Sequence, residues 1–540
     1  NENGQPLVGA FLSVRGVGST AVGRSTTSDV EGNFRVSGLD PGIYTVFANA
    51  PAYTSDPGPP TFYRLGDTVR LEMVRGGVIT GTVTNSLGEP VIGVRVRALR
   101  IRDAKGQAQK LPGFAVNERS TDDRGIYRIY GLTSGTYLVS AGGGGGFTSG
   151  FNPYDSDVPT YSPSSTRDTA AEVSVRAGEE SGADIRYRGE PGYTVSGTVN
   201  VAGTNGATIS LTPVGSGAAV ASAFQVPGNR GFAFNGLGDG EYKLVAQELN
   251  SVQSAGVMPL MAMSDVKRVT VKGANVTGIE LIPKPLASIA GRITLERSKA
   301  PECQGKRPPL FAETLVQVQR HENDSEDDDP IYMRMFANSG TVDEKGAFML
   351  RNLRPGRFRF EPRFYARYWY LQSITINTAA PKPQKNDAAA NWTTVKSGDQ
   401  LTALTITLAE GAASIRGRLA LAEGAVPPAG MVVYLIPAEP DKADDVLRFF
   451  VTDIASDGSF TLNNLAPGKY LVFTQTNVDP QIGTLTKLRQ PEAASARTKL
   501  RRSSEAQKGE AQKGEAQKGE TQKTEIELKP CQNLADYQLK

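Results

Sequence analysis

Histidine, cysteine and long hydrophobic segments are scarce or missing, and each scarcity excludes a class of protein. The 540 residues hold one histidine, His321, and two cysteines, Cys303 and Cys531. A peptidase zinc site that consists of two histidines and a glutamate cannot be built from a chain with one histidine. No apolar run reaches the length of about 18 residues that a membrane-spanning helix needs, so the sequence predicts no such helix.

An excess of one charge is also missing. Lysine and arginine number 59 against 56 acidic residues, and the net charge of +3 provides no strong field to attract nucleic acid. Glycine and proline are plentiful instead, at 59 and 33 residues, which is typical of chains with many turns between short strands. We therefore expect an all-β protein with no nucleic-acid partner.

One pattern of residues occurs five times with constant spacing. It consists of a glycine, an aromatic residue two positions later, a leucine at seven, a second glycine at ten and a second aromatic residue at twelve. The copies span Gly32–Tyr44, Gly125–Tyr137, Arg230–Tyr242, Gly346–Phe358 and Gly458–Tyr470, and the third carries Arg230 in place of the first glycine. Repetition on this scale indicates an array of similar small modules.

Each copy predicts a strand, a tight turn and a second strand. The first aromatic residue alternates with polar neighbours, as expected for a strand with one buried face. Three copies, at Pro41, Pro355 and Pro467, then place proline before the second glycine. This pair reverses the chain, because proline fixes φ and glycine accepts φ > 0.

A short apolar strand with a central glycine precedes four of the five copies. These Gly-centred strands are Val78–Val83, Val195–Val199, Ile289–Ile293 and Ile415–Leu419. The first copy lacks one, so the sheet of the first module is predicted to have a vacant strand position with unpaired backbone beside it. The alternative is that the sequence was cut from a longer precursor that carries this strand.

These features together resemble the carboxypeptidase regulatory-like domain. The residues that carry the resemblance are the Gly-centred strands, the Gly-x-Pro-x-x-Gly-Val/Ala turns at Gly4–Ala10 and Gly88–Val94, and the Asp-x-x-Gly-x-aromatic block. The resemblance implies a tandem array of seven-stranded, transthyretin-like or immunoglobulin-like β-sandwiches. We expect five modules, at 1–74, 75–190, 191–284, 285–410 and 411–540, with insertions in the fourth and a low-complexity segment in the fifth.

The C-terminal region predicts a short helix, a spacer and a strand. Pro491 and the residues after it suit the first turn of a helix. The Glu-Ala-Gln-Lys-Gly repeats that follow, at 505–519, keep no apolar face and predict a solvated spacer. The acidic run at 324–329 matches no EF-hand spacing and predicts a solvated loop. For the chain as a whole, we expect no metal, no cofactor and no catalytic residue.

Cys303 and Cys531 predict one disulfide in an oxidising compartment, within a chain or between neighbouring subunits. Two unrelated free thiols are the alternative.

An aromatic cluster is the strongest candidate for a binding surface. Its members, within seven consecutive positions, are Phe364, Tyr365, Tyr368, Trp369 and Tyr370. One strand face cannot bury so many rings, so one hypothesis is an outward surface that stacks on sugars or a partner. The alternative is that the rings fill the core of the fourth module.

A chain of repeated modules without a catalytic motif is more typical of a structural protein than of an enzyme. We expect a non-enzymatic protein at a bacterial surface or secreted from it, a stalk or pilus-like subunit that polymerises head to tail by strand complementation. The segments expected at the joint are Pro6, Leu7, Val8, Ile526, Leu528, Leu534, Tyr537 and Leu539, although Ile526 and Leu528 also suit the last strand of the fifth module. The competing expectation is an adhesive accessory protein that binds a polysaccharide or a cell-surface protein.

Overall fold

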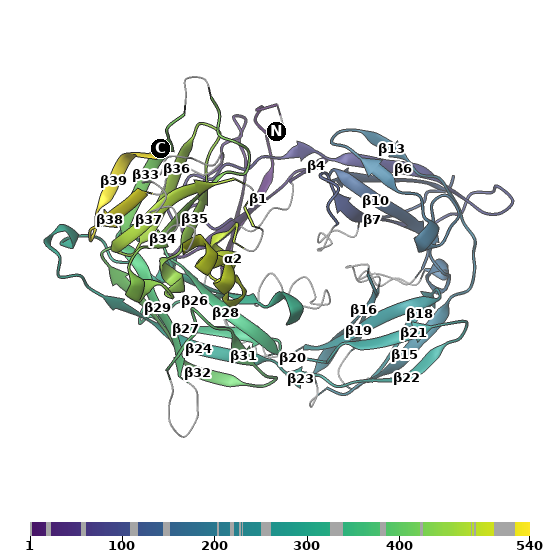
Figure 1. Ribbon diagram of the computed structural model, residues 1–540. Helices are drawn as coiled ribbons and strands as arrows, with labels where there is room; N and C mark the ends of the chain where they lie inside the picture. The colour runs from purple at the N-terminus through teal and green to yellow at the C-terminus, as the bar shows by residue number, and fades with distance from the viewer. Residues whose placement is uncertain are drawn as a thin grey trace. The chain divides into compact units, whose positions relative to one another are not determined.

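The fold is almost entirely β-strand (Figure 1). The computed structural model describes residues 3–17, 23–55, 61–108, 117–143, 152–201, 205–215, 221–225, 228, 230–249, 261–324, 339–377, 385–421, 425–476, 478–479, 482–501 and 524–539. These residues form two compact units. The first holds the described residues up to Ala287 together with Arg351–Arg354, and the second holds the others.

The first unit begins with a three-stranded antiparallel sheet, in the order β2-β1-β3, and a two-stranded one, β4-β5. The bounds are β1 Phe11–Gly16, β2 Arg24–Thr27, β3 Tyr44–Asn49, β4 Tyr53–Thr54 and β5 Val74–Arg75.

The next two sheets of this unit lie between residues 77 and 186. One has the order β11-β10-β7-β8 with β12 also on β10, and the other places β6 between β9 and the short strands β13 and β14. The bounds are β6 Gly77–Thr84, β7 Arg95–Asp103, β8 Asn117–Ser120, β9 Ile126–Leu132, β10 Gly135–Ala141, β11 Thr160–Tyr161, β12 Val173–Val175, β13 Glu180–Gly182 and β14 Ile185–Arg186.

The last two sheets of the first unit have the orders β18-β15-β22 and β17-β16-β19-β20-β23, with β21 also on β19. The bounds are β15 Tyr193–Val199, β16 Gly206–Pro213, β17 Ala221–Gln225, β18 Gly231–Leu237, β19 Gly240–Leu249, β20 Ala262–Met263, β21 Lys267–Val271, β22 Val276–Leu281 and β23 Lys284–Pro285.

The second unit contains four sheets. Their orders are β27-β24-β32-β29-β30, β26-β25-β28-β31, β36-β33-β39 and β35-β34-β37-β38. The bounds are β24 Ala287–Glu296, β25 Leu315–Arg320, β26 Ser339–Thr341, β27 Ala347–Leu353, β28 Gly356–Arg363, β29 Trp369–Asn377, β30 Lys385–Asp387, β31 Thr393–Val395, β32 Gln400–Glu410, β33 Ala413–Leu419, β34 Val432–Pro437, β35 Phe450–Asp453, β36 Ser459–Leu465, β37 Gly468–Gln475, β38 Thr524–Leu528 and β39 Asn533–Leu539.

Helical structure is limited to short segments. The α-helix α2 covers Leu485–Leu488, and residues 494–501 are helical directly after the 3₁₀ turn Pro491–Ala493, where the sequence predicts a helix start. Further 3₁₀ turns lie at Pro153–Ser156, Arg167–Thr169, Pro301–Cys303, Phe311–Glu313, Glu322–Asp324, Pro440–Lys442 and Val446–Arg448. Among the described helices, none is long and apolar enough to cross a membrane. The predicted spacer at 505–519 lies outside the described residues.

Pairs of sheets pack face to face around apolar cores. In the core of residues 413–539, Ile415 and Leu462 from one sheet contact Val433 and Val472 from the other. The clusters in 77–187 and 193–281 likewise combine side chains of two sheets each. Two sheets around one core define a β-sandwich. The predicted tandem β-sandwich fold is therefore confirmed.

The four Gly-centred strands share one position in their sheets. Each of β6, β15, β24 and β33 lies between the strand that carries the first aromatic residue of the repeat and the closing strand of its segment. The closing strand runs parallel to the Gly-centred strand. In the pairs β15–β22, β24–β32 and β33–β39 the register shifts just before the central glycine, whereas β6 keeps one register with β13 and β14.

The central glycine is required because both neighbours crowd it. A Cβ atom on Gly417 would lie 2.6 Å from the ring of Phe460 and 2.6 Å from the carbonyl oxygen of Tyr537. At Gly197 the Cβ would approach the backbone of Ile279 still more closely. The repeated glycine in the sequence thus marks the place where the backbone of the parallel closing strand leaves no room for a Cβ atom.

Candidate functional site

The described N-terminal segment has no strand at the position that Gly-centred strands occupy in the later segments. The stretches that correspond to its two neighbours, 33–39 and 67–73, form no strand either. Phe34 is half-buried, whereas its counterparts Tyr127 and Phe460 are 2% and 3% exposed. The apolar side chains at 34, 36, 69 and 71 therefore alternate along two unpaired stretches.

The predicted N-terminal joint residues lie beside this position. Pro6 and Val8 are exposed, Val8 by 60%, while Leu7 packs against the cluster of Ala10, Ala50 and Met73. The carbonyl of Leu7 also accepts a hydrogen bond from Ser28 Oγ.

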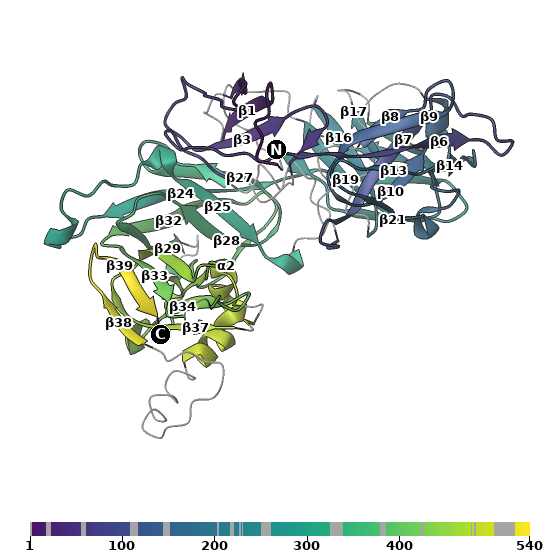
Figure 2. The same cartoon turned by 90° about the horizontal axis from the view of Figure 1, so that it is seen from above.

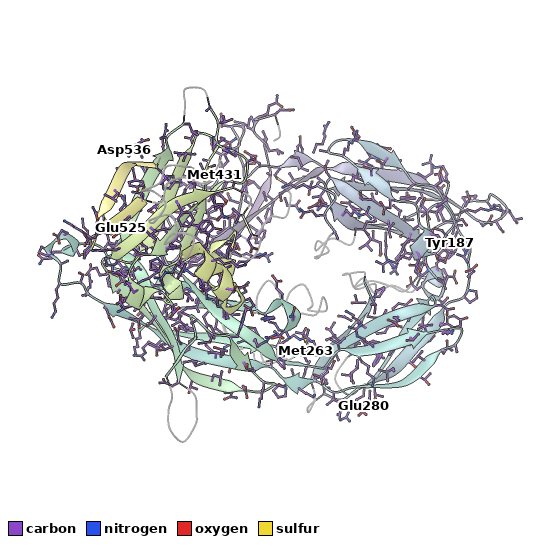
Figure 3. The ribbon with its side chains drawn as sticks, in the orientation of Figure 1. Tyr187, Met263, Glu280, Met431, Glu525 and Asp536 are labelled. Atoms are coloured by element: carbon purple, nitrogen blue, oxygen red, sulfur yellow. A yellow bond between two sulfur atoms is a disulfide. The ribbon has the colours of Figure 1, made fainter. Side chains whose placement is uncertain are left out.

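The C-terminal residues predicted as candidate strand donors are paired within their own sandwich in this structure, and Ile526 and Leu528 lie in its last sheet as the alternative prediction has it. Ile526 and Leu528 lie in β38, which pairs antiparallel with β37. Leu534, Tyr537 and Leu539 lie in β39, which pairs parallel with β33. All of these side chains pack in or against one core. Figure 2 shows the strands β38 and β39 beside β33 and β37. Exposed side chains of the two strands include Glu525 and Asp536 (Figure 3).

The two cysteines form a disulfide within the chain. Cys303 and Cys531 have Cα atoms 5.4 Å apart and are separated by 228 positions in the sequence. Both are buried, and the backbone N–H of Cys531 donates to the carbonyl of Gly411. The predicted disulfide is thus present, and it ties the 3₁₀ turn Pro301–Cys303 to the turn between β38 and β39.

His321 has a structural environment. Its Nδ1 lies 3.1 Å from the backbone N of Asn323 and 3.1 Å from Nη2 of Arg357, and both of these groups can only donate. Nδ1 therefore accepts, and Nε2 carries the proton that faces Glu492 Oε1 at 3.1 Å. Trp392 donates to the same oxygen at 2.9 Å. Within the described ranges, no cluster of acidic, histidine or cysteine residues could hold a metal ion.

The aromatic cluster does not form one surface. Trp369 is fully buried, with the guanidinium of Arg297 over its ring at 5.3 Å, so Trp369 cannot stack on a ligand. Tyr368 and Tyr370 are half-buried, and Lys306 lies over Tyr368 at 4.6 Å. Only Phe364 and Tyr365, of which Tyr365 is 40% exposed, line a common cavity.

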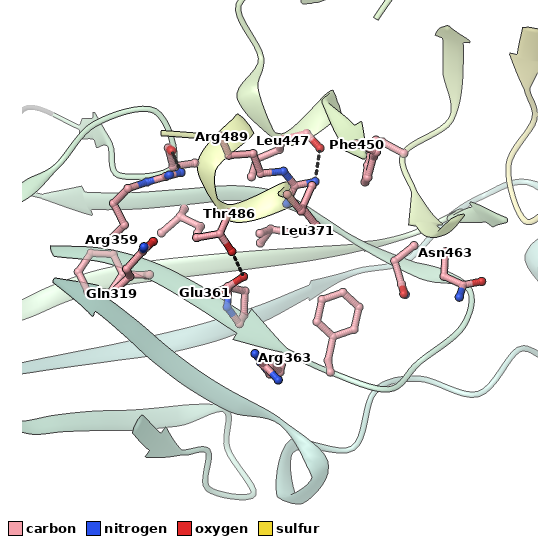
Figure 4. A pocket seen from close by; sticks show the side chains of 18 of the residues that line it. Gln319, Arg359, Glu361, Arg363, Leu371, Leu447, Phe450, Asn463, Thr486 and Arg489 are labelled. Atoms are coloured by element: carbon pink, nitrogen blue, oxygen red, sulfur yellow. Dashed lines mark hydrogen bonds between the residues drawn. The ribbon is translucent and has the colours of Figure 1, made fainter. Parts of the chain in front are cut away.

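This cavity has a volume of about 380 Å³ and lies within the second unit (Figure 4). Strands β25, β28 and β29 form one part of its wall, and β35, β36 and α2 form the other. The volume falls in the range of about 300–1,000 Å³ that is common for small-molecule sites. We refer to it as the β28–α2 pocket.

Arginine side chains dominate the charge of the β28–α2 pocket. Arg359 is 8% exposed and donates from Nη2 to the carbonyl of Ala389 at 2.8 Å. Arg489 donates to the carbonyls of Phe449 and Leu447 at 3.2 and 3.1 Å. Burial lowers the pKa of each guanidinium to about 10, which leaves both protonated at neutral pH.

Polar groups complete the pocket. Figure 4 shows Thr486 next to Glu361, and the Thr486 hydroxyl donates to Glu361 Oε1 at 3.3 Å. Asn464 donates from Nδ2 to the carbonyls of Ala366 and Trp369 at 2.8 and 2.7 Å, which fixes its side chain. It adopts φ of 56°, a conformation that asparagine tolerates better than most residues. Sequence reasoning found two of the four aromatic residues of this pocket, Phe364 and Tyr365, but missed Phe360, Phe450 and the arginines.

Comparison with known proteins identifies the N-terminal domain. Residues 1–74 match the carboxypeptidase regulatory-like domain. A search of curated proteins found no match. Among solved structures, the chain is similar to the Bacillus anthracis TIE protein, with 10% identity over 98% of this chain and 74% of that chain and a TM-score of 0.16.

Two pilins are similar at the same low level. GBS52, the minor pilin of Streptococcus agalactiae, has 13% identity over 34% of this chain and 84% of that chain, with a TM-score of 0.19. BcpA, the major pilin subunit of Bacillus cereus, has 12% identity over 62% of this chain and 100% of that chain, with a TM-score of 0.15. Similarity at this level says nothing about the function of this chain.

Proposed function

We propose that this protein is an extracellular structural protein, a stalk or filament subunit, without catalysis of its own. Its N-terminal residues 1–74 match the carboxypeptidase regulatory-like domain. The proposal includes five sandwich modules with boundaries near 74, 190, 284 and 410. The only histidine supports it, because His321 is held between Glu492 and Arg357. The Cys303–Cys531 disulfide favours an oxidising compartment outside the cytoplasm.

The observation that carries the stalk role is the double attachment between residues 285–410 and 411–540. The disulfide joins Cys303 in the first of these segments to Cys531 in the second. Independently, Asn464 binds the carbonyls of Ala366 and Trp369 across the same junction. A covalent bond placed beside a hydrogen-bonded contact resists separation under tension, which is the requirement of a stalk.

Force spectroscopy on the full chain, pulled from its two ends, tests this role. The disulfide withholds 228 residues from extension, and at about 3.5 Å per residue this amounts to about 800 Å. We expect the oxidised chain to extend by about that much less than the reduced chain or the Cys303→Ser variant. If the oxidised wild type and Cys303→Ser extend equally and at equal force, the proposed mechanical role is wrong.

Self-association is the second part of the proposal. We propose that the vacant position between 33–39 and 67–73 receives a Gly-centred strand from a second copy of the chain. By the pattern of the later segments, the incoming strand runs antiparallel to 33–39 and parallel to 67–73. Addition of a strand satisfies the backbone groups on both sides, which is how β-strand complementation joins subunits.

A peptide experiment measures this acceptor directly. We expect a synthetic peptide of residues 76–86, which contains the Gly-centred strand Val78–Val83, to bind the full chain and to reduce its assembly in sedimentation and electron microscopy. Phe34→Asp should abolish binding, whereas Val30→Asp, at a side chain that is 68% exposed, should not. A chain that neither assembles nor binds the peptide contradicts the filament.

A further inference from the structure

We propose that the β28–α2 pocket binds a carboxylated sugar, such as a uronic acid unit of an acidic polysaccharide. This inference does not rest on the stalk role: the pocket shares Asn464 with the junction between 285–410 and 411–540, but its ligand is argued from other features. It rests on three features of the pocket: its charge, its aromatic rim and its neutral amide groups.

The charge of the pocket favours an anion. Its charged lining residues are Arg359, Arg363 and Arg489 against Glu361 alone. Arg359 is more than nine-tenths buried, and its Nε has no hydrogen-bond partner among the described residues. Three guanidiniums against one carboxylate leave the lining with an excess of positive charge, which favours a carboxylate as ligand.

The arginines are also held in place before any ligand arrives. The carbonyl of Ala389 fixes Nη2 of Arg359, and those of Leu447 and Phe449 fix Nη2 and Nε of Arg489. Guanidinium groups with a fixed plane match the two oxygens of a carboxylate, and little side-chain entropy remains to be lost on binding.

The aromatic rim and the amides favour a sugar over other anions. Tyr365 is 40% exposed and lies with Phe364 at the pocket, where a ring face can cover the C–H face of a pyranose. Gln319, Asn463 and Asn464 add amide groups that both donate and accept, as the hydroxyls of a sugar do. Asn464 uses its Nδ2 for the backbone, and its Oδ1 accepts no hydrogen bond from the described residues.

Isothermal titration calorimetry with the full oxidised chain tests the proposal. The probe is trigalacturonate, and maltotriose is the uncharged sugar of equal length. We expect trigalacturonate to bind and maltotriose to bind at least about tenfold more weakly. Added salt should weaken the binding of trigalacturonate, because exposed charges are screened. A tetra-aspartate peptide is the third ligand, since it carries carboxylates without a sugar ring.

Two variants assign the binding to this pocket. Tyr365→Ala should lower the affinity for trigalacturonate about tenfold, because it removes the ring on which the sugar stacks. Tyr130→Ala, at an exposed tyrosine of β9 that is 45% exposed, is the matched control and should not change the affinity. Arg363→Gln should reduce the affinity and also its dependence on salt.

Three outcomes would overturn the proposal. They are no binding of trigalacturonate up to about 10 mM, equal affinity for maltotriose or the aspartate peptide, and equal losses in Tyr365→Ala and Tyr130→Ala. Circular dichroism and the thermal midpoint of each variant show whether a loss of binding comes from a loss of folding. None of these outcomes bears on the stalk or filament experiments, so the two proposals fail separately.

Discussion

Tyr470 donates its hydroxyl hydrogen bond to the carbonyl oxygen of Ala466, four residues earlier, with 2.7 Å between the two oxygens. The same bond recurs in three other repeats, as Tyr44 to Asp40, Tyr137 to Thr133 and Tyr242 to Gly238, at 2.7, 2.7 and 2.8 Å. Each of these tyrosines is the second aromatic residue of its repeat. The bond therefore fixes the turn between two strands to the strand that follows, and the fourth repeat, with Phe358, lacks it.

The first prediction concerns this bond. Tyr470 is fully buried, so Tyr470→Phe removes a buried hydrogen bond and leaves the Ala466 carbonyl without that donor. We expect a loss of about 1–2 kcal/mol in the free energy of unfolding, measured by urea denaturation. Tyr130→Phe is the matched control at an exposed tyrosine and should change stability by less than about 0.5 kcal/mol. An equal loss in both variants would contradict the role of the bond.

The parts of the fold that follow from short-range patterns could be predicted from the sequence. The Gly-centred strands and the aromatic strands carry their signal in residues close together, such as Gly417 and its apolar neighbours. Both form where expected, except in the first repeat, where 33–39 form no strand. The helix start at Pro491 is also local. These segments obey rules of spacing and conformation that do not depend on distant contacts.

The candidate pocket could be predicted only in part, because it joins residues from distant parts of the chain. Arg359 on β28 and Arg489 after α2 meet only through the packing of two sandwiches, and no local pattern connects them. Trp369 and Tyr365 look equivalent in sequence, yet the first is fully buried and the second is 40% exposed. Likewise the strand Ile415–Leu419, which lies in β33, was predicted, but its parallel pairing with β39 was not.

The second prediction concerns the central glycine of β33. Gly417→Ala places a Cβ against Phe460 and the carbonyl of Tyr537, both at 2.6 Å, so one of them must move. Overpacking of this kind costs about 1–3 kcal/mol, which a shift of the urea midpoint would reveal. Gly182→Ala is the matched control, because its Cβ meets nothing within 4 Å. Should Gly417→Ala be as stable as Gly182→Ala, the close packing at the central glycine would be disproved.

The third prediction concerns the disulfide. Reduction, or Cys303→Ser, opens a closed loop of 228 residues. In the chain-entropy model such a loop stabilises the folded state by about 5 kcal/mol, if the residues inside it unfold together. We expect the second unit to have a lower thermal midpoint in the reduced wild type and in Cys303→Ser. Calorimetry with and without reductant measures this midpoint. Reductant should not change the thermal midpoint of Cys303→Ser. A wild-type midpoint that is the same with and without reductant would contradict the prediction.

The last prediction concerns pH. Arg357 binds Asp324 through Nε and Nη2, each at 2.9 Å, and through its backbone N–H at 2.8 Å. The hydrogen bond from the Arg357 side chain is the main cause that lowers the pKa of Asp324 to about 2, whereas an aspartate in an unfolded chain has a pKa of about 3.9.

The direction of the pH dependence follows from whether the folded or the unfolded chain binds the proton of the Asp324 carboxyl group more tightly. Since the unfolded chain binds it more tightly, this pair stabilises the fold above about pH 4, and the contribution disappears as the pH falls to about 2. The difference in thermal midpoint between wild type and Asp324→Asn should therefore be largest near neutral pH and shrink through this range. A difference that stays constant from pH 7 to about pH 2 would show that Asp324 acts without its charge.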